Sequence, residues 1–415
     1  MEEWKEYKAT DFCKNVTDGT HDSPKQKSEG YYLITSKHIK GNTIDFDSAY
    51  KISEEDYNKI IQRSKVDQWD VIISMIGAYC GFCYLEKSTK TDYAIKNVGL
   101  FKVGSEIKSK WLYYYLSSPA GQNKLHLLRT GSSQPYIALN SLRNFTIPVP
   151  DEKTMRSIIY VLQSLDDKIE VNRRINENLE QQAQALFKSW FVDFEPFKNQ
   201  PFVESELGMI PQGWRVGTLG DICVTNKRTY KGDFVSEIEY IDTGCVTNNI
   251  IDTPQILNPA IDKIPSRARR AVTEGDIIYS SVRPNQRHYA LLFNPSSNTV
   301  VSTGFVVITA NWSGYRYYIY QYLIQDEIVN KLQAIAEQSV STFPSLNASD
   351  LTNLKIVIPP NDVVGDFAAL NCSFITQINK KQQESRCLAE LRDTLLPRLM
   401  SGELHVNDML LSEKR

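Results

Sequence analysis

The chain has 415 residues, of which 41% are hydrophobic and 23% are charged, and its formal net charge is −2. This length allows two to four domains, each with a core of its own, and the near-neutral charge excludes a uniformly basic nucleic-acid binder. The N-terminus lacks the features of a signal peptide, and no run approaches the roughly 18 apolar residues of a membrane span. An odd number of cysteines, seven, is typical of a reducing compartment. We therefore expect a cytoplasmic protein without a membrane contact.

Residues 1–150 are expected to form a first α+β lobe. Short runs rich in β-branched residues, VIISMIG and FTIPVP, alternate with turn signals and with one amphipathic helix, WLYYYLSS. Cys80 and Cys83 form a single CxxC pair, and no second pair completes the four ligands of a zinc site. We therefore predict core thiols and no metal site.

Residues 151–195 are predicted to form a long helix with a coiled-coil seam. Its seam residues recur at spacings that alternate between four and three: Ile158, Leu162, Leu165, Ile169, Asn172, Asn176, Leu179, Ala183, Leu186 and Trp190. Buried asparagines at such positions cost stability but favour one register. An ordinary surface helix with a wide polar face is the alternative, but a helix of about 50 Å is long for a globular domain.

The second half of the chain repeats the first. VDQWDVIIS from Val66 matches VTEGDIIYS from Val272, and QPYIALNSLRNFTIPVP from Gln134 matches TFPSLNASDLTNLKIVIPP from Thr342. A Pro- and Gly-rich connector at 196–211 leads to a second lobe at 212–360, which contains the helical run YRYYIYQYLIQDEIVNKL. A second long helix at 361–404 and a tail at 405–415 follow.

The second helix has a seam of its own. We assign Phe367, Leu370, Phe374, Ile378, Leu388, Leu391 and Leu395 to it. The predicted fold is thus α+β, with two tandem lobes separated by two long helices that form an antiparallel coiled coil within one chain. Such a pair would relate the lobes by a pseudo-twofold axis.

Motifs for catalysis are missing from the sequence. It contains no GxGxxG after a strand, no GxxxxGK[ST] and no [DN]PP[FYW], so neither a nucleotide nor a methyl donor has a motif site. Pro150 and Asp151, followed by Asp166 to Lys168, imitate a PD…DxK nuclease. That metal site needs ligands on adjacent strands, and these carboxylates lie in or before a helix, so we predict no nuclease and no catalytic residues.

Basic and amide side chains in loops are the candidates for DNA contact, because they can reach phosphates and groove edges. In the first lobe they are Lys25, Lys27, Lys37, His38, Arg129, Ser132, Ser133 and Gln134. In the second lobe they are Lys227, Arg228, Arg267, Arg269, Arg270, Arg283, Asn285, Gln286 and Arg287. Each one taken singly is more often a solvated surface residue, and about a third are expected to touch DNA.

Several motifs together resemble the specificity subunit of type I restriction-modification systems. They are the P-x-GW-x4-LGDI opening from Pro211 to Ile222, the QP-x-I element that leads into IPVP from Gln134 to Pro150, and LDDKIEVNRRINENLEQQAQALFKSWFVDF with a weaker copy ending LLPRLMSGEL. The resemblance covers essentially the whole chain. The first lobe departs from the pattern, because it has KATDFC where LGDIC is usual and no P-x-G before Trp4.

The resemblance implies a division of labour. Each lobe would be a target-recognition domain for one half of a bipartite double-stranded DNA site. The helices would dock two methyltransferase subunits, and restriction/translocase subunits would join through them. This chain would bind no cofactor, and S-adenosylmethionine, ATP and Mg²⁺ would belong to the partner subunits. The alternative is a tandem-repeat scaffold that binds only proteins, but it leaves the arginine-rich loops unexplained.

Overall fold

A computed structural model describes residues 4–131, 134–232, 237–339 and 343–406. The chain divides into two compact units, one of residues 1–169 and 386–415 and the other of residues 170–385. Each unit therefore combines one lobe with the adjoining halves of two long helices. Within the described ranges, no helix is both long and apolar enough to cross a membrane.

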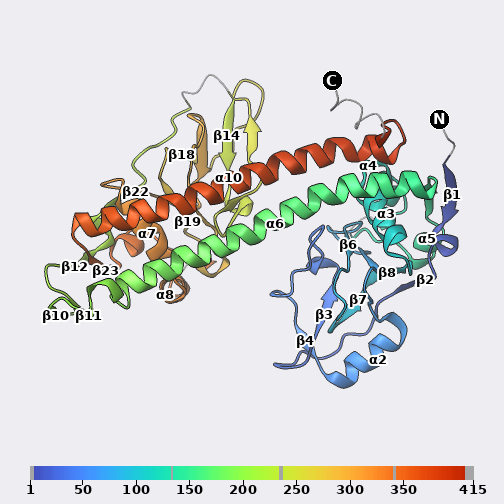
Figure 1. Cartoon of the computed structure of the whole chain (residues 1–415), viewed down its shortest axis with the longest axis horizontal. Helices are drawn as coiled ribbons and strands as arrows, with labels where there is room; N and C mark the ends of the chain where they lie inside the picture. Colours follow the sequence, from blue (N-terminus) through green and yellow to red (C-terminus); the bar gives the residue numbers. More distant parts are fainter. Residues whose placement is uncertain (1–3, 132–133, 233–236, 340–342, 407–415) are drawn as a thin grey trace. The chain divides into compact units, whose positions relative to one another are not determined.

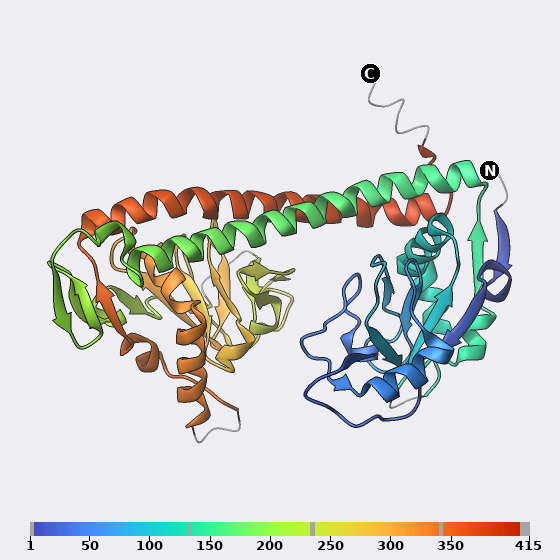
Figure 2. The ribbon, with the colours of Figure 1, turned by 60° about the horizontal axis from the view of Figure 1, so that its bottom comes forward.

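The first unit is built on a four-stranded sheet in the order β2-β8-β5-β6 and a three-stranded sheet in the order β4-β3-β7. Helix α3 packs on β6. Figure 2 shows the strands of both sheets in blue and teal. The elements are β1 (Lys5–Lys8), α1 (Ala9–Phe12), β2 (Asn15–Asp18), β3 (Tyr31–Thr35), η1 (Ser36–His38), β4 (Lys51–Ile52), α2 (Glu54–Ser64), β5 (Val71–Ser74), β6 (Cys83–Leu85), β7 (Tyr93–Lys96), β8 (Val98–Lys102), α3 (Glu106–Ser117), α4 (Pro119–Leu127), α5 (Leu139–Arg143), β9 (Thr146–Val149) and the start of α6 (Glu152–Phe191).

The second unit repeats this plan, with four-stranded sheets in the orders β13-β22-β19-β20 and β17-β14-β21-β18. Its elements are η2 (Glu195–Phe197), β10 (Phe202–Ser205), β11 (Gly208–Pro211), β12 (Arg215–Thr218), η3 (Leu219–Asp221), β13 (Cys223–Thr225), β14 (Ile238–Ile241), η4 (Thr243–Cys245), β15 (Val246–Thr247), β16 (Ile250–Ile251), β17 (Gln255–Leu257), β18 (Ala268–Ala271), β19 (Ile277–Ser280), η5 (Pro284–Gln286), β20 (Tyr289–Leu291), β21 (Thr299–Ser302), β22 (Phe305–Ala310), α7 (Tyr315–Leu323), α8 (Asp326–Glu337), α9 (Ala348–Thr352), β23 (Lys355–Ile358) and the start of α10 (Asn361–Met400).

Matching strands confirm the internal repeat. Strand β3 pairs in parallel with β7 in the first unit, as β14 does with β21 in the second unit. The antiparallel pair of β1 and β9 corresponds to the antiparallel pair of β12 and β23. Two details differ from the predictions. The second lobe's long helical run is broken into α7 and α8 around Ile324 and Gln325, and the connector contains a hairpin of β10 and β11.

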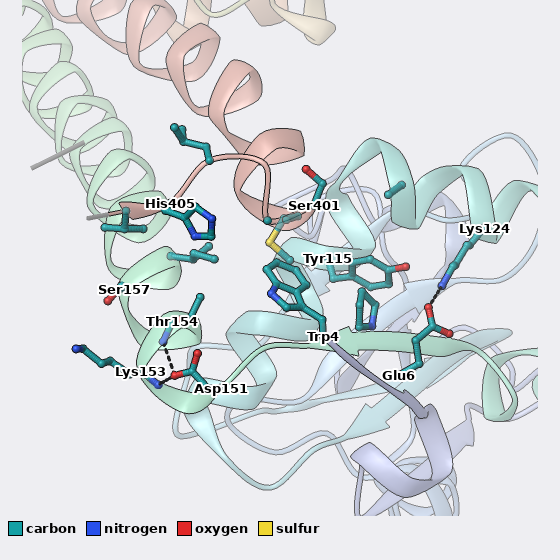
Figure 3. A pocket seen from close by; sticks show the side chains of 17 residues that line it. Trp4, Glu6, Tyr115, Lys124, Asp151, Lys153, Thr154, Ser157, Ser401 and His405 are labelled. Carbon is teal, nitrogen blue, oxygen red and sulfur yellow. Dashed lines mark hydrogen bonds and ion pairs between the residues drawn. The ribbon is translucent and has the colours of Figure 1, made fainter. Parts of the chain in front are cut away.

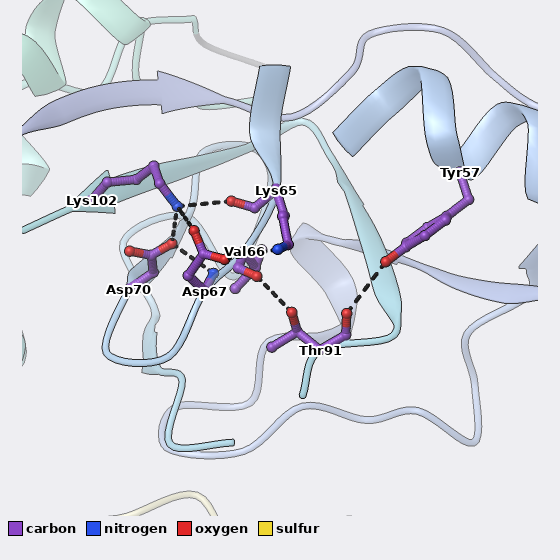
Figure 4. Close-up of polar contacts among 7 residues, drawn as sticks. All are labelled: Tyr57, Lys65, Val66, Asp67, Asp70, Thr91 and Lys102. Atoms are coloured by element: carbon purple, nitrogen blue, oxygen red, sulfur yellow. Dashed lines mark hydrogen bonds and ion pairs between the residues drawn. The ribbon is translucent and has the colours of Figure 1, made fainter. Parts of the chain in front are cut away.

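A buried aspartate explains why the VDQWDVIIS motif recurs. In the first unit Asp70, at the entrance to β5, accepts the backbone N–H of Asp67 at 2.8 Å and the Nζ of Lys102 at 2.6 Å (Figure 4). In the second unit Asp276 accepts the backbone N–H of Thr273 at 2.8 Å and Nη1 of Arg228 at 3.0 Å. A buried carboxylate needs such partners, since an unpaired charge in the core is costly.

Helices α6 and α10 pack against each other in opposite directions within each unit (Figure 1). In the first unit Ile158 and Leu162 share a core with Leu399. In the second unit Phe187 and Phe191 share a core with Phe367, and the Phe191 and Phe367 rings lie 4.8 Å apart. The predicted antiparallel coiled coil is therefore confirmed, whereas the pseudo-twofold axis between the lobes stays a prediction.

None of the ten predicted seam residues of α6 is exposed, and Ile158, Leu162, Asn172, Leu179 and Ala183 are buried. Asn172 is fully buried, and its Nδ2 donates to Glu384 Oε2 at 3.1 Å and to Ser385 Oγ at 3.3 Å. Two seam residues of α10 are wrong, since Leu370 and Leu391 are each 47% exposed. The seam at the first of these turns is occupied by the buried Asn371, a polar residue that an apolar pattern passes over.

Replacing Ile378 of α10 by alanine should destabilise the chain by about 2–5 kcal/mol, because Ile378 is buried in the second unit's core and alanine leaves a cavity. The matched control is Leu370→Ala on the same helix, which should cost less than about 0.5 kcal/mol because Leu370 is half exposed. Urea denaturation followed by circular dichroism measures both changes. Equal losses would contradict the observed seam.

Candidate nucleic-acid interface

The loop between β19 and β20 presents three exposed polar side chains of the predicted set, Arg283, Asn285 and Gln286. Its backbone is fixed from several sides: Arg283 N donates to Pro344 O at 3.1 Å, Gln286 N to Arg283 O at 2.9 Å, and Asn285 N to Gln333 Oε1 at 3.2 Å. Arg283 and Arg287 adopt left-handed backbone conformations, with φ of 48° and 56°. This loop therefore holds its side chains in a defined arrangement.

A second basic segment, which contains Arg267 and Arg269, lies beside the loop between β19 and β20. The turn at Thr303 and Gly304 contacts both, since Thr303 N donates to Arg267 O and Ser281 N donates to Gly304 O, each at 2.8 Å. A continuous rim then runs from Arg267 through this turn to Arg283. We name this surface the second rim.

The first unit builds an equivalent rim from different side chains. Ser36 Oγ accepts the backbone N–H of Ile76 at 3.3 Å, and Gly77 N donates to Pro135 O at 2.9 Å, as Arg283 N does to Pro344 O. Lys40 Nζ lies 4.0 Å from the centroid of the Tyr79 ring. We name this surface, with its neighbours Lys37, Gln134 and Tyr136, the first rim.

Several predicted contact residues of the second lobe have other roles. Arg228 is the counter-ion of the buried Asp276, Arg287 pairs with Asp326 at 2.5 Å, and Arg270 is half-buried in β18, where burial lowers its pKa. The exposed members of the set are Lys227, Arg267, Arg269, Arg283, Asn285 and Gln286. These six remain candidates for DNA contact.

The first lobe shows a similar division. His38 is a wrong candidate, because it is fully buried, its Nδ1 accepts the backbone N–H of Thr35 at 2.9 Å, and burial lowers its pKa. Arg129 is half-buried and donates to Cys80 O at 2.6 Å, so it supports the β5–β6 turn. The exposed candidates are Lys25, Lys27, Lys37 and Gln134, whereas Ser132 and Ser133 lie outside the described residues.

Sequence reasoning missed the rim residues Lys40, Tyr79, Tyr136 and Phe343. Phe343 is 53% exposed, and Arg283 Cζ lies 4.9 Å from its ring centroid. Exposed aromatic rings beside cations are typical of surfaces that bind other molecules. For two of the missed residues the sequence did contain a signal: Tyr136 follows Pro135, and Phe343 precedes Pro344, so an aromatic residue lies next to the equivalent proline in both repeats.

The carboxylates of the nuclease-like pattern have structural roles. Asp151 Oδ1 accepts the backbone N–H groups of Lys153 and Thr154 at the start of α6, and hydrogen bonds from Thr154 lower its pKa. Asp166 Oδ1 accepts Arg392 Nη1 at 2.8 Å. Within the described residues, no three His, Cys, Asp or Glu side chains are grouped to hold a metal ion.

The CxxC thiols belong to the first unit's core. Cys80 and Cys83 are both buried, and burial raises the pKa of each, that of Cys83 to about 12. Burial thus disfavours the thiolate form of both side chains. Their burial agrees with the prediction of core thiols.

A cavity of about 650 Å³ lies in the first unit, where Trp4, the start of α6 and the residues after α10 meet (Figure 3). Among its charged side chains, Glu6 accepts Lys124 Nζ at 3.2 Å, and Asp151 Oδ1 accepts the backbone N–H groups of Lys153 and Thr154. The equivalent tryptophan of the second unit, Trp214, packs against Phe194, which follows α6, and against Phe197 of the connector. His405 also lines this cavity.

Glu180 of α6 joins the helix to the second lobe. Its Oε1 accepts Asn249 Nδ2 at 2.9 Å and the Tyr320 hydroxyl at 3.4 Å, whereas no hydrogen bond reaches Oε2. Burial raises the pKa of Glu180. The contact thus places a carboxylate with incomplete hydrogen bonding between lobe and helix.

The family model for the type I restriction modification DNA specificity domain matches residues 1–181 and 211–381. The chain belongs to this family. The two matches correspond to the two lobes, so the specificity domain occurs twice, as the repeat in sequence and fold requires.

Two curated specificity subunits and one solved structure resemble this specificity subunit. The type I restriction enzyme MjaIX specificity subunit of Methanocaldococcus jannaschii is 30% identical over 315 residues, which cover 73% of this chain and 71% of that protein. The HindI specificity subunit of Haemophilus influenzae is 24% identical over 332 residues, which cover 65% and 71%. The S subunit from M. genitalium has a TM-score of 0.53 at 15% identity and 96% coverage of both chains, which shows a similar fold.

Replacing Arg228 by alanine should destabilise the chain by about 2 kcal/mol, because the buried Asp276 loses a charged hydrogen-bond donor. Lys227→Ala is the matched control, because Lys227 is next to Arg228 in the chain and its side chain is exposed. This variant should change stability by less than about 0.5 kcal/mol. Thermal unfolding measures both. If Arg228→Ala left stability unchanged, its assignment as a structural counter-ion would be wrong.

Glu180→Gln should remove a pH dependence of stability. Because the folded-state pKa of Glu180 is raised, its stabilising contribution is fully present below the unfolded pKa and is lost as pH rises through the folded pKa. The melting temperature of the variant minus that of the natural chain should therefore increase from about pH 4 to about pH 8. A constant difference would contradict the burial of an ionisable Glu180.

Proposed function

We propose that this specificity subunit binds double-stranded DNA, that each lobe reads one half of a bipartite site, and that the long helices dock two methyltransferase subunits. The main support is the duplicated rim. In the second unit the exposed Arg283 lies on the loop that follows β19, and in the first unit the exposed Lys40 lies over the ring of Tyr79 on the loop that follows β5. Both loops are held through a proline carbonyl, which accepts the backbone N–H of Gly77 or Arg283. Cations on fixed loops suit contacts with phosphates and base edges.

The helices support the docking part of the proposal. Over their middle and outer faces α6 and α10 expose polar and charged residues together with single apolar residues such as Val171, which is 49% exposed. Each helix has 40 residues, and a helix of that length spans about 60 Å. Faces of this length give two partner subunits room to bind. The restriction/translocase subunits would join through those partners.

The chain itself is proposed to be non-catalytic. S-adenosylmethionine, ATP and Mg²⁺ are assigned to the partner subunits, because the sequence lacks the glycine-rich and [DN]PP[FYW] motifs. We expect the purified full chain, given S-adenosylmethionine and DNA, to transfer no methyl groups, and methylation to begin on addition of the methyltransferase subunits. Scintillation counting of tritium-labelled DNA measures this. Transfer by the chain alone would refute the proposal.

The half-site assignment is tested by exchanging residues 212–360 for those of a relative and sequencing the methylated adenines made by the assembled complex. One half of the bipartite site should change, and the other should stay the same, because each rim is built within one unit. Exchange of residues 1–150 is the reciprocal control and should change only the other half. Changes in both halves after either exchange would contradict one lobe per half-site.

A further inference from the structure

The position three residues after the central strand requires a left-handed backbone in both units. In the first unit this position is Gly77, with φ of 79°, three residues after Ser74 at the end of β5. In the second unit it is Arg283, with φ of 48°, three residues after Ser280 at the end of β19. Both donate their backbone N–H to a proline carbonyl, Pro135 or Pro344. The two positions are therefore structurally equivalent.

Glycine adopts this conformation without steric cost, whereas a side chain such as that of arginine costs roughly 1 kcal/mol. The second unit thus retains an arginine where the repeat shows that glycine fits the same turn. Strain of this kind concentrates at functional sites, because the rest of the structure has to hold it in place. The loop does hold it, through the hydrogen bonds of Arg283, Asn285 and Gln286.

The guanidinium of Arg283 is free of acidic partners and oriented by an aromatic ring. Among the described residues no carboxylate lies within ion-pair distance of it, whereas the neighbouring Arg287 is engaged by Asp326. Arg283 Cζ lies 4.9 Å from the ring centroid of Phe343, and both side chains are exposed. A ring beneath a guanidinium restricts its orientation and leaves its N–H donors available.

We propose that Arg283 reads a guanine in the half-site of the second lobe, and that Phe343 positions it. The inference rests on the proposed function. A planar fork of N–H donors matches the O6 and N7 acceptors of guanine in the major groove, and this is the commonest specific contact of arginine with DNA. Because Gly77 occupies the equivalent place, the first lobe lacks this contact. This arginine contact is therefore expected in the half-site of the second lobe only.

The test is selection of duplexes from a randomised double-stranded DNA library by the full chain assembled with its methyltransferase subunits, followed by sequencing. The natural chain should select two separated half-sites, with a guanine in the half read by the second lobe. Arg283→Asn keeps a residue that tolerates the left-handed backbone and should lower the preference for that guanine by about 10- to 100-fold. Every other position of both half-sites should stay unchanged.

Two comparisons separate base reading from other roles. Phe343→Leu should lower the same preference partly, and Phe343→Tyr should restore it, because a ring again lies under the guanidinium. Lys355→Ala on β23, which removes a cation paired with Glu206 at 2.9 Å, should change no base preference. Thermal unfolding of each variant checks that the fold is retained.

The outcomes that overturn the inference are distinct. Loss of affinity by Arg283→Asn that is equal for all sequences would assign Arg283 to a phosphate, and an unchanged preference would show that it does not read DNA. A second half-site without guanine would exclude the contact outright. If the natural chain selected no bipartite site, the proposed function itself would fail, and the inference with it.

Discussion

Burial of the seam between α6 and α10 is the interaction on which each unit depends. In both units the helix pair supplies part of a lobe's core: Met155 and Leu162 of α6 share the first unit's core with Trp111, and Phe187 of α6 shares the second unit's core with Tyr318. One core cluster of each unit is therefore shared by the lobe and the helices, whereas others, such as the cluster of Ile34 and Ile72, lie within the lobe alone.

The two units use the same seam with different polar contacts. In the first unit Asp166 accepts the Tyr114 hydroxyl and Arg392 Nη1, each at 2.8 Å. At the positions that the repeat makes equivalent, the second unit has Ile375 and Ala183, both fully buried. A polar residue in a seam favours one register and one partner at some cost in stability. The two ends of the helix pair are thus chemically distinct, which suits one particular lobe at each end.

Backbone hydrogen bonds hold the loops that form the two rims, and the side chains on these loops differ between the two units. The same turn holds Gly77 in one unit and Arg283 in the other, and the same element before the helix α5 or α9 carries Tyr136 or Phe343 near its proline. A fixed backbone with variable side chains allows one fold to bind different sequences. This is the division between scaffold and site that the proposed function requires.

The sequence by itself determined the repeat, the two lobes and the antiparallel long helices. These features depend on periodicity and on local patterns, which a single sequence carries. The predicted seam positions Leu370 and Leu391 are wrong. Near Leu370 the buried residue is Asn371, which a search for apolar residues at heptad spacing does not select. Only the tertiary structure decided which cations are structural. Arg228 and Arg287 look like Arg283 in the sequence, but their carboxylate partners Asp276 and Asp326 lie 48 and 39 residues away, and contacts over such separations exist only once the chain has folded.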